Sequence, residues 1–399
     1  MASGTLPSAS AESWRYSPIG ELDLDRYAPA SPSTAPPRAG TGANAPTASV
    51  LDLGAVAATV SIVDGRLADV ALDPAIASLG VSVAVATDSE EVALLAYPEP
   101  DGLTDLHDAF VADVVVVDVP AGVAVEQPIL VAVSASEVGA ATFPHLVVRT
   151  GESGEATVVV QSVSPDGNVL VVPVVELHLA PASNLRYLDL QTLGSDAWQA
   201  SHVLATIGRD ATLRAWVAAA GGEYARTYVA VSLPGQGASA KVSGVYFGDR
   251  GQVLDFRSLQ DHIGTRSVSD FQLKGAVVDE AHGIYTGLIR VREGAKATES
   301  FLGNRNLVLA EGAHVDSVPN LEITNENDIR SCGHAAATGP VDEEHVFYLE
   351  SRGVPTVAAE RLIVNGFFED VLGDVPIPAV AAAVRAAFAR KLEKVGAHG

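Results

Sequence analysis

The chain has 399 residues, of which 25 are basic and 49 acidic, so its formal net charge at pH 7 is −24. So acidic a surface repels nucleic acid and anionic membranes, which argues against both as partners. Hydrophobic residues make up 48% of the chain but aromatic residues only 6%. The apolar content is mostly Val, Ala and Leu, and β-branched Val favours strands.

Residues 1–27 form a short segment of mixed composition that contains a candidate docking sequence, Trp14-Arg15-Tyr16. The segment lacks the basic start and apolar core of a secretory signal, and no run of about 18 apolar residues occurs in the chain. With a free thiol, these features lead us to expect a cytoplasmic protein without a membrane span. Residues 28–48 are rich in Pro, Ala, Gly and Thr and are predicted to be a flexible linker.

Residues 49–340 are predicted to form a β core. Short Val-rich runs such as VVVVDVP (114–120) and PILVAVSA (128–135) recur between Gly, Asp, Asn or Pro residues. Corner phrases beginning at residues 208, 235, 292 and 310 share Gly, a short spacer, Ala and then alternating polarity. Asn-Gly, the strongest hairpin signal, does not occur in the region. The pattern favours a β-solenoid, with a β-sandwich as the alternative.

Residues 341–399 are predicted to form a helical module. The phrase DEEHVFYLESRG (342–353) begins with acidic residues that suit a helix N-terminus and ends on a Gly that suits a C-terminus. A second helix has an apolar face from Ala359 to Phe367, and a third over 377–395 repeats apolar residues four apart. We expect this module to cap the solenoid, because an open end exposes strand edges and core.

The only cysteine, Cys332, lies two residues before His334 in SCGHAAATG (331–339). Thiolate and imidazole are good metal ligands, but a structural zinc ion or an iron–sulfur cluster normally takes four protein ligands. The pair is therefore a candidate for part of a metal site that a partner completes. The alternatives, a small buried cysteine and a histidine satisfied within the core or an interface, stay open. Glu322 is a candidate carboxylate partner of this site or a solvated acid at a strand end, and the isolated His262 and His282 are predicted to be structural.

The segment from Pro319 to Val371 resembles the SufB/SufD family of iron–sulfur cluster assembly scaffolds. The matching features are Pro-x-Leu-Glu-Ile from 319, the Cys-x-His pair, the acidic residues 342–343 and Phe-Tyr-Leu-x-Ser-Arg-Gly at 347–353. Weaker similarity extends upstream to HGIYTGLIRV (282–291) and to Trp-Arg-Tyr at 14–16. Gly333, Ala335 and Ala337 replace the usual Ser or Thr, Gly and Thr, so any role of a hydroxyl at 333 or 337 is lost here.

The resemblance implies a right-handed parallel β-helix and a non-catalytic scaffold. Such a scaffold pairs through its β-helix with a SufB-like subunit, or with a second copy of itself. Its C-terminal helices bind the ABC-type ATPase SufC, for which Tyr348, Arg352 and Phe367 are the contact candidates. A transient iron–sulfur cluster or iron would lie at the subunit interface near His334, held by no chain alone, and binding of a reduced flavin is left open. The single cysteine and the early Trp-Arg-Tyr sequence favour the SufD type over the SufB type.

Several catalytic motifs are absent from the sequence. There is no GxxxxGK[ST] run, so the chain has no P-loop for ATP, and CxxC, HExxH and GxSxG are also missing. A β-solenoid enzyme acting on carbohydrates with paired carboxylates is the remote alternative. The missing secretion signal, the few aromatic residues and the C-terminal motif argue against it.

Overall fold

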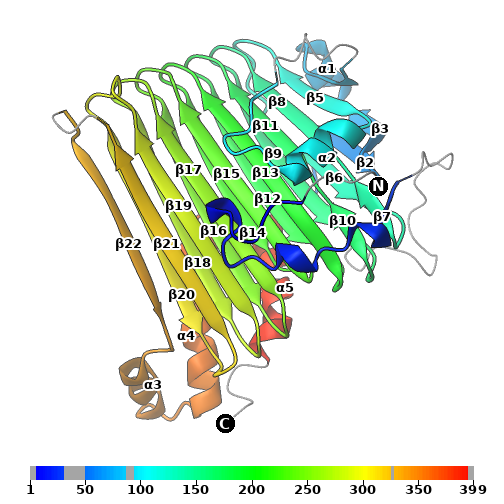
Figure 1. Ribbon diagram of the computed structural model, residues 1–399. Coiled ribbons are helices and arrows are strands. Elements are labelled where there is room, and N and C mark those ends of the chain that lie inside the picture. The colour runs from blue at the N-terminus through cyan, green and yellow to red at the C-terminus, as the bar shows by residue number, and fades with distance from the viewer. Residues whose placement is uncertain (1–5, 31–49, 87–93, 325–327, 394–399) are drawn as a thin grey trace.

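The computed structural model describes residues 6–30, 50–86, 94–324 and 328–393. Its core is a parallel β-solenoid in which the chain alternates between two facing sheets (Figure 1). The first sheet contains β1 (Ala28–Pro29), β4 (Ser82–Val85), β5 (Val114–Val119), β7 (Ala140–Thr142), β8 (His145–Thr150), β10 (Val169–Val171), β11 (Val174–Leu179), β13 (Ala197–Ile207), β15 (Tyr224–Leu233), β17 (Val253–His262), β19 (His282–Val291) and β21 (His314–Ile323).

The second sheet runs in the order β22-β20-β18-β16-β14-β12-β9-β6-β2-β3. Its strands are β2 (Ala58–Val63), β3 (Arg66–Leu72), β6 (Ile129–Ser134), β9 (Glu155–Val163), β12 (Asn184–Thr192), β14 (Thr212–Ala219), β16 (Ser239–Gly248), β18 (Val268–Val277), β20 (Glu299–Val308) and β22 (Ser331–Gly339). Among the described strands only the pairs β2–β3 and β4–β5 are antiparallel. Parallel pairing by stacked coils confirms the solenoid and excludes the antiparallel sandwich.

The solenoid interior is filled by alternate residues of both sheets, since side chains on a strand point to opposite faces with period two. Rows of Val, Leu and Ala dominate the early coils, and Tyr246, Phe256 and Phe271 fill the later ones. Burial of such side chains contributes roughly 25 cal/mol for each Å² of apolar area removed from water. The buried interior rows therefore stabilise the stack of coils.

The corners between the sheets follow the predicted phrases. Ala211, Ala238, Ala295 and Ala313 are all buried at corners, directly or shortly before the next strand. Beside two of them the backbone turns through positive φ, 57° at Asp210 and 71° at Gly237. A small buried residue lets the chain turn closely over the coil below, which explains why the phrase recurs.

The described helices are α1 (Pro74–Ser78), α2 (Gly102–Phe110), α3 (Glu343–Glu350), α4 (Thr356–Leu372) and α5 (Pro378–Leu392). None of them is long and apolar enough to cross a bilayer. The last two pack on the outer face of the second sheet, where Phe368 and Phe388 meet Phe247 of β16. The predicted helical module is present, but the prediction that it caps the solenoid is wrong. The module lies along the side of the second sheet, because the outer faces of β12, β14, β16, β18 and β20 supply the apolar surface on which it packs.

Residues 6–30 lie across the outer face of the first sheet and include three short 3₁₀ helices, Glu12–Trp14, Ile19–Glu21 and Leu24–Arg26. The predicted linker began at residue 28, but Ala28 and Pro29 form β1, which pairs with β7. Residues 31–48 of that linker are outside the described part of the chain.

Candidate functional site

The last coil leaves one end of the solenoid open. Within the described residues, β22 pairs only with β20 and β21 only with β19, so each sheet ends in an unpaired edge. Leu321 of β21 continues the interior row that contains buried Ile289, yet 39% of Leu321 is exposed. Unpaired edges and exposed core are an aggregation hazard that proteins normally cover. This end is therefore suited to a partner.

Cys332 and His334 both lie on β22 and point to the interior face of the second sheet. Cys332 pairs in register with Ser300, and His334 pairs with the fully buried Leu302. Because they are two residues apart, both side chains extend interior rows at the open end. Cys332 is half-buried against the core, whereas His334 is exposed.

A polar network lies behind Cys332, and the sequence did not suggest it. His262 Nε2 lies 2.8 Å from Ser269 Oγ, which lies 2.8 Å from Oγ of Ser300, the register partner of Cys332. Burial lowers the pKa of His262 to about 4, so its imidazole is neutral. The predicted structural role of His262 fits this buried position, but the network also connects it to the open end.

The thiol of Cys332 is protonated at neutral pH in the isolated chain, because burial raises its pKa. A thiolate is the form that binds metal, and a nearby cation or metal is what lowers a thiol pKa. In the isolated chain the Cys332 thiol is therefore not in the form that binds metal.

Glu322 lies on β21, in the other sheet from Cys332. Its carboxylate accepts a 2.8 Å hydrogen bond from Arg290 Nε on the neighbouring strand, and more than half of its side chain is exposed. This arrangement is a surface ion pair, which contributes little to stability. It provides no contact that would support Glu322 as a partner of the Cys332–His334 site.

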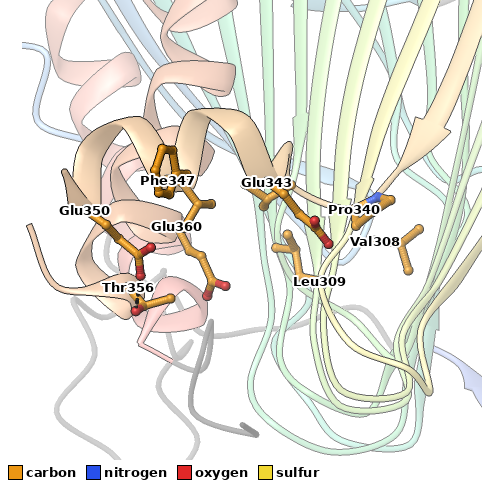
Figure 2. A pocket seen from close by; sticks show the side chains of 10 residues that line it. Val308, Leu309, Pro340, Glu343, Phe347, Glu350, Thr356 and Glu360 are labelled. Carbon is orange, nitrogen blue, oxygen red and sulfur yellow. Dashed lines mark hydrogen bonds between the residues drawn. The ribbon is translucent and has the colours of Figure 1, made fainter.

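A second surface lies on α3 and α4, beside the pocket in Figure 2. The pocket is bounded by the end of β20, the segment after β22 and the two helices, with Glu343, Glu350 and Glu360 among its lining residues. Phe347 is 71% exposed and Tyr348 58% exposed, both on α3. Exposed aromatic residues beside acids suit a partner surface with apolar and basic groups.

The three predicted contact residues of the helices differ in position. Arg352 is exposed, with its guanidinium carbon 5.3 Å from the centre of the Tyr348 ring, so both belong to the α3 surface. Phe367 instead packs against Phe368, with Lys274 Nζ 4.7 Å from its ring centre. Phe367 therefore helps to attach α4 to β18. The exposed Phe347 was not among the predicted contacts, although it belongs to the same family phrase.

A model of the SufBD core domain of the SUF system for FeS cluster assembly matches residues 131–367. An iron–sulfur cluster assembly SufBD family protein of Mycobacterium bovis is 37% identical over 276 residues, 67% of this chain and 68% of its own length. The cluster assembly protein SufD of Escherichia coli is 26% identical over 373 residues, covering 91% of this chain and 84% of the relative. SufD of Bacillus subtilis is 28% identical over 295 residues, 73% of this chain and 67% of the relative. The matched region contains both the open end and the α3 surface, and the chain belongs to the SufBD family of iron–sulfur cluster assembly proteins.

Proposed function

We propose that this chain is a SufD-type scaffold subunit that covers its open end with a SufB-like partner. The observation that carries the proposal is the position of Cys332 and His334, two potential ligands on interior rows at an unpaired edge. A partner strand added to β22 would bury both side chains in the new interface. A transient iron–sulfur cluster or iron would then be bound by ligands from both subunits, in a cytoplasmic complex.

The α3 surface is the proposed contact for an ABC-type ATPase such as SufC. Phe347, Tyr348 and Arg352 present aromatic and cationic groups on one short helix and the turn after it. Such residues are enriched where partners bind tightly. The chain has no P-loop sequence of its own, so ATP hydrolysis would occur in that partner and this chain would be non-catalytic.

Co-expression with a SufB-like and a SufC-like protein tests the proposal, followed by reconstitution with ferrous iron and sulfide. We expect a stable complex whose visible absorbance shows a cluster, and a loss of most of that absorbance in His334→Ala without loss of the complex. Arg186→Ala is the control, because Arg186 is exposed on β12, five strands away from β22 in the second sheet. Normal cluster yield in His334→Ala would contradict the role of His334.

A homodimer is the second candidate, since the open end is equally suited to a second copy of the chain. Sedimentation of the purified chain distinguishes the two. A concentration-dependent dimer that persists in the presence of the SufB-like protein favours the homodimer, whereas a one-to-one heterodimer favours the SufD-type assignment.

A further inference from the structure

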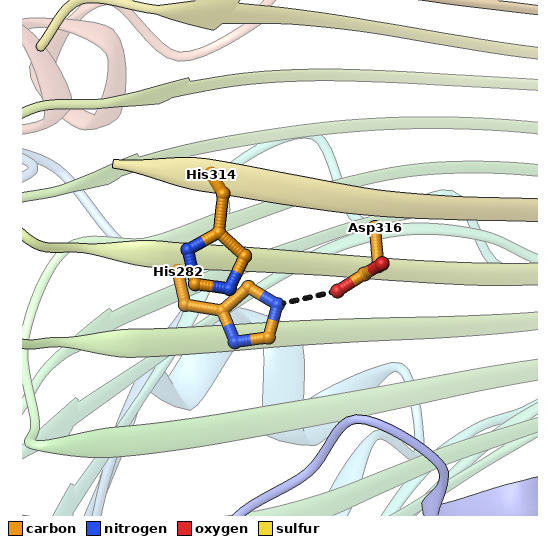
Figure 3. Close-up of side chains that lie close together, drawn as sticks. All are labelled: His282, His314 and Asp316. Carbon is orange, nitrogen blue, oxygen red and sulfur yellow. Dashed lines mark hydrogen bonds and ion pairs between the residues drawn. The ribbon is translucent and has the colours of Figure 1, made fainter. Parts of the chain in front are cut away.

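A second group of potential metal ligands lies on the outer face of the first sheet, apart from Cys332 and His334. His282 is the first residue of β19, His314 is the first residue of β21, and Asp316 is two residues further along β21. His282 and His314 are register partners, so one imidazole lies directly beside the other (Figure 3). His282 was predicted to be isolated and structural, because 31 residues separate the two histidines in the sequence and hide their pairing.

The three side chains converge. The two imidazole rings are stacked with centres 3.8 Å apart and planes inclined by 23°. His282 Nε2 is 2.8 Å from Asp316 Oδ2. One potential ligand atom from each residue lies within 4.8 Å of the other two. Side chains bound to one ion at about 2.0–2.2 Å have donor atoms roughly 3 Å apart, so small rotations are enough to bring these atoms around an ion.

We propose that His282, His314 and Asp316 bind a divalent first-row transition metal ion. Two imidazole nitrogens and one carboxylate oxygen are the donor set of open Zn²⁺ and non-haem Fe²⁺ sites. Alkaline-earth ions prefer sites composed of oxygen atoms, so the two histidines select against Ca²⁺ and Mg²⁺. Three protein ligands leave at least one coordination position for water or another ligand.

The electrostatics of the site agree with this donor set. Burial, the first cause, lowers the pKa of His282, although the hydrogen bond to Asp316 opposes the shift. The Asp316 carboxylate, 2.8 Å from His282 Nε2, supplies negative charge that a divalent ion needs.

The site is distinct from the open-end pair. His282 and Asp316 point to the outer face of the first sheet, whereas Cys332 and His334 point to the interior face of the second. The inference therefore does not depend on the proposed function, and either can fail without the other.

Titration of the untagged, metal-free full-length chain with Co²⁺ tests the inference, followed by the visible d–d bands and metal analysis. We expect one tightly bound ion per chain. Asp316→Asn keeps an acceptor for His282 but not the charge, and His314→Phe keeps a stacked ring but not the ligand. Each should weaken binding by at least about tenfold, the smallest loss typical of changed metal sites.

Two controls make the result specific. His345→Phe alters an exposed histidine that also lies near a carboxylate, with Nδ1 3.8 Å from Asp342 Oδ2, and should bind Co²⁺ as the parent chain does. X-ray absorption of the Co²⁺-loaded parent chain should show nitrogen and oxygen ligands only. Absence of a stoichiometric ion, unchanged affinity in Asp316→Asn and His314→Phe, or a sulfur ligand from Cys332 would each overturn the inference.

Discussion

The guanidinium of Arg226 on β15 lies 3.9 Å above the ring of Trp14, which is fully buried. The same guanidinium donates a 2.7 Å hydrogen bond to the carbonyl of Ser13, and Trp14 Nε1 donates a 2.8 Å bond to Asp101. A desolvated cation over an aromatic face contributes about 2 kcal/mol. The N-terminal segment is thus docked on the chain's own first sheet, through the Trp-Arg-Tyr sequence that resembles the family.

Trp14→Ala should release residues 6–30 from the sheet. The loss of a fully buried Trp side chain costs about 3 kcal/mol and removes the largest of the buried anchors of this segment, which also include Ile19, Leu22 and Tyr27. Hydrogen exchange should show faster exchange in this segment with little change in β13–β19. Arg15→Ala is the control, because Arg15 binds Arg257 through its backbone carbonyl, which the substitution retains. Equal protection in Trp14→Ala and the parent chain would contradict the docking role.

Glutamate substitutions at Leu321 and Leu362 should each affect the binding of a different partner. Leu321 lies at the open end and is 39% exposed, while Leu362 lies on α4 and is 54% exposed. Leu321→Glu should weaken pairing with the SufB-like subunit by at least about tenfold, since a charge would be buried there without a partner. Leu362→Glu should leave this pairing intact and weaken binding of the SufC-like protein, because the proposed ATPase surface extends from α3 onto α4.

Each leucine variant is therefore the control for the other, and both positions are exposed enough for the monomer to tolerate glutamate. Pull-down with each partner separately measures both effects. If Leu321→Glu pairs normally, or if both variants lose both partners equally, the assignment of two separate surfaces is wrong.

The solenoid was predictable because its corners are local. Gly208 and Ala211 lie within four residues, and burial of such an alanine at each turn leaves a repeated trace in the sequence. Helix α2 also has a local sequence signal, because Asp101 and Thr104 form a capping box before Leu106, but no helix was predicted there.

The open end was not predictable, because it depends on which coil is last and on where the helices pack. Phe367 shows the difficulty: it was chosen as a partner contact, but Lys274, 93 residues earlier, lies over its ring and bonds its carbonyl. The register of β22 was equally hidden, since Ala and Gly residues around His334 carry little periodic signal.

The stability of the fold should fall as pH decreases from about 6.5 to about 4. Burial lowers the pKa of His107 and His262 to about 4 and that of His202 to about 3. In this interval the unfolded chain binds protons that the folded chain does not, so acid favours unfolding. Each of the three histidines contributes about 3 kcal/mol to the decrease in the free energy of unfolding over this interval. Denaturant unfolding at several pH values across this range measures the slope of the free energy of unfolding against pH.

His262→Asn should make that slope shallower, because Asn can still bond Ser267 and Ser269 but does not titrate. His345→Asn, at an exposed position, should leave it unchanged. A free energy of unfolding that is constant between pH 6.5 and 4.5 would contradict the assignment of neutral buried histidines.

Asp189 should change the pH dependence of stability in the direction opposite to that of the histidines. It is buried inside the solenoid, and burial raises its pKa to about 6 although the Tyr187 hydroxyl donates a 3.0 Å hydrogen bond to it. The folded chain therefore binds a proton more tightly than the unfolded chain, and ionisation of Asp189 above about pH 6 costs about 3 kcal/mol. The three histidines have a larger combined effect than this one acid, so the free energy of unfolding should still be higher at neutral pH than at pH 4.

Asp189→Asn should stabilise the chain at pH 7.5 by about 2 kcal/mol, because the amide oxygen still accepts from Tyr187 and no charge is buried. The gain should vanish towards pH 4, where Asp189 is protonated. Tyr187→Phe is the matched comparison and should destabilise at pH 7.5, since it leaves the carboxylate without its donor. Thermal melts of both variants at the two pH values measure this. A lower melting temperature of Asp189→Asn at pH 7.5 would mean that the charge on Asp189 stabilises the interior.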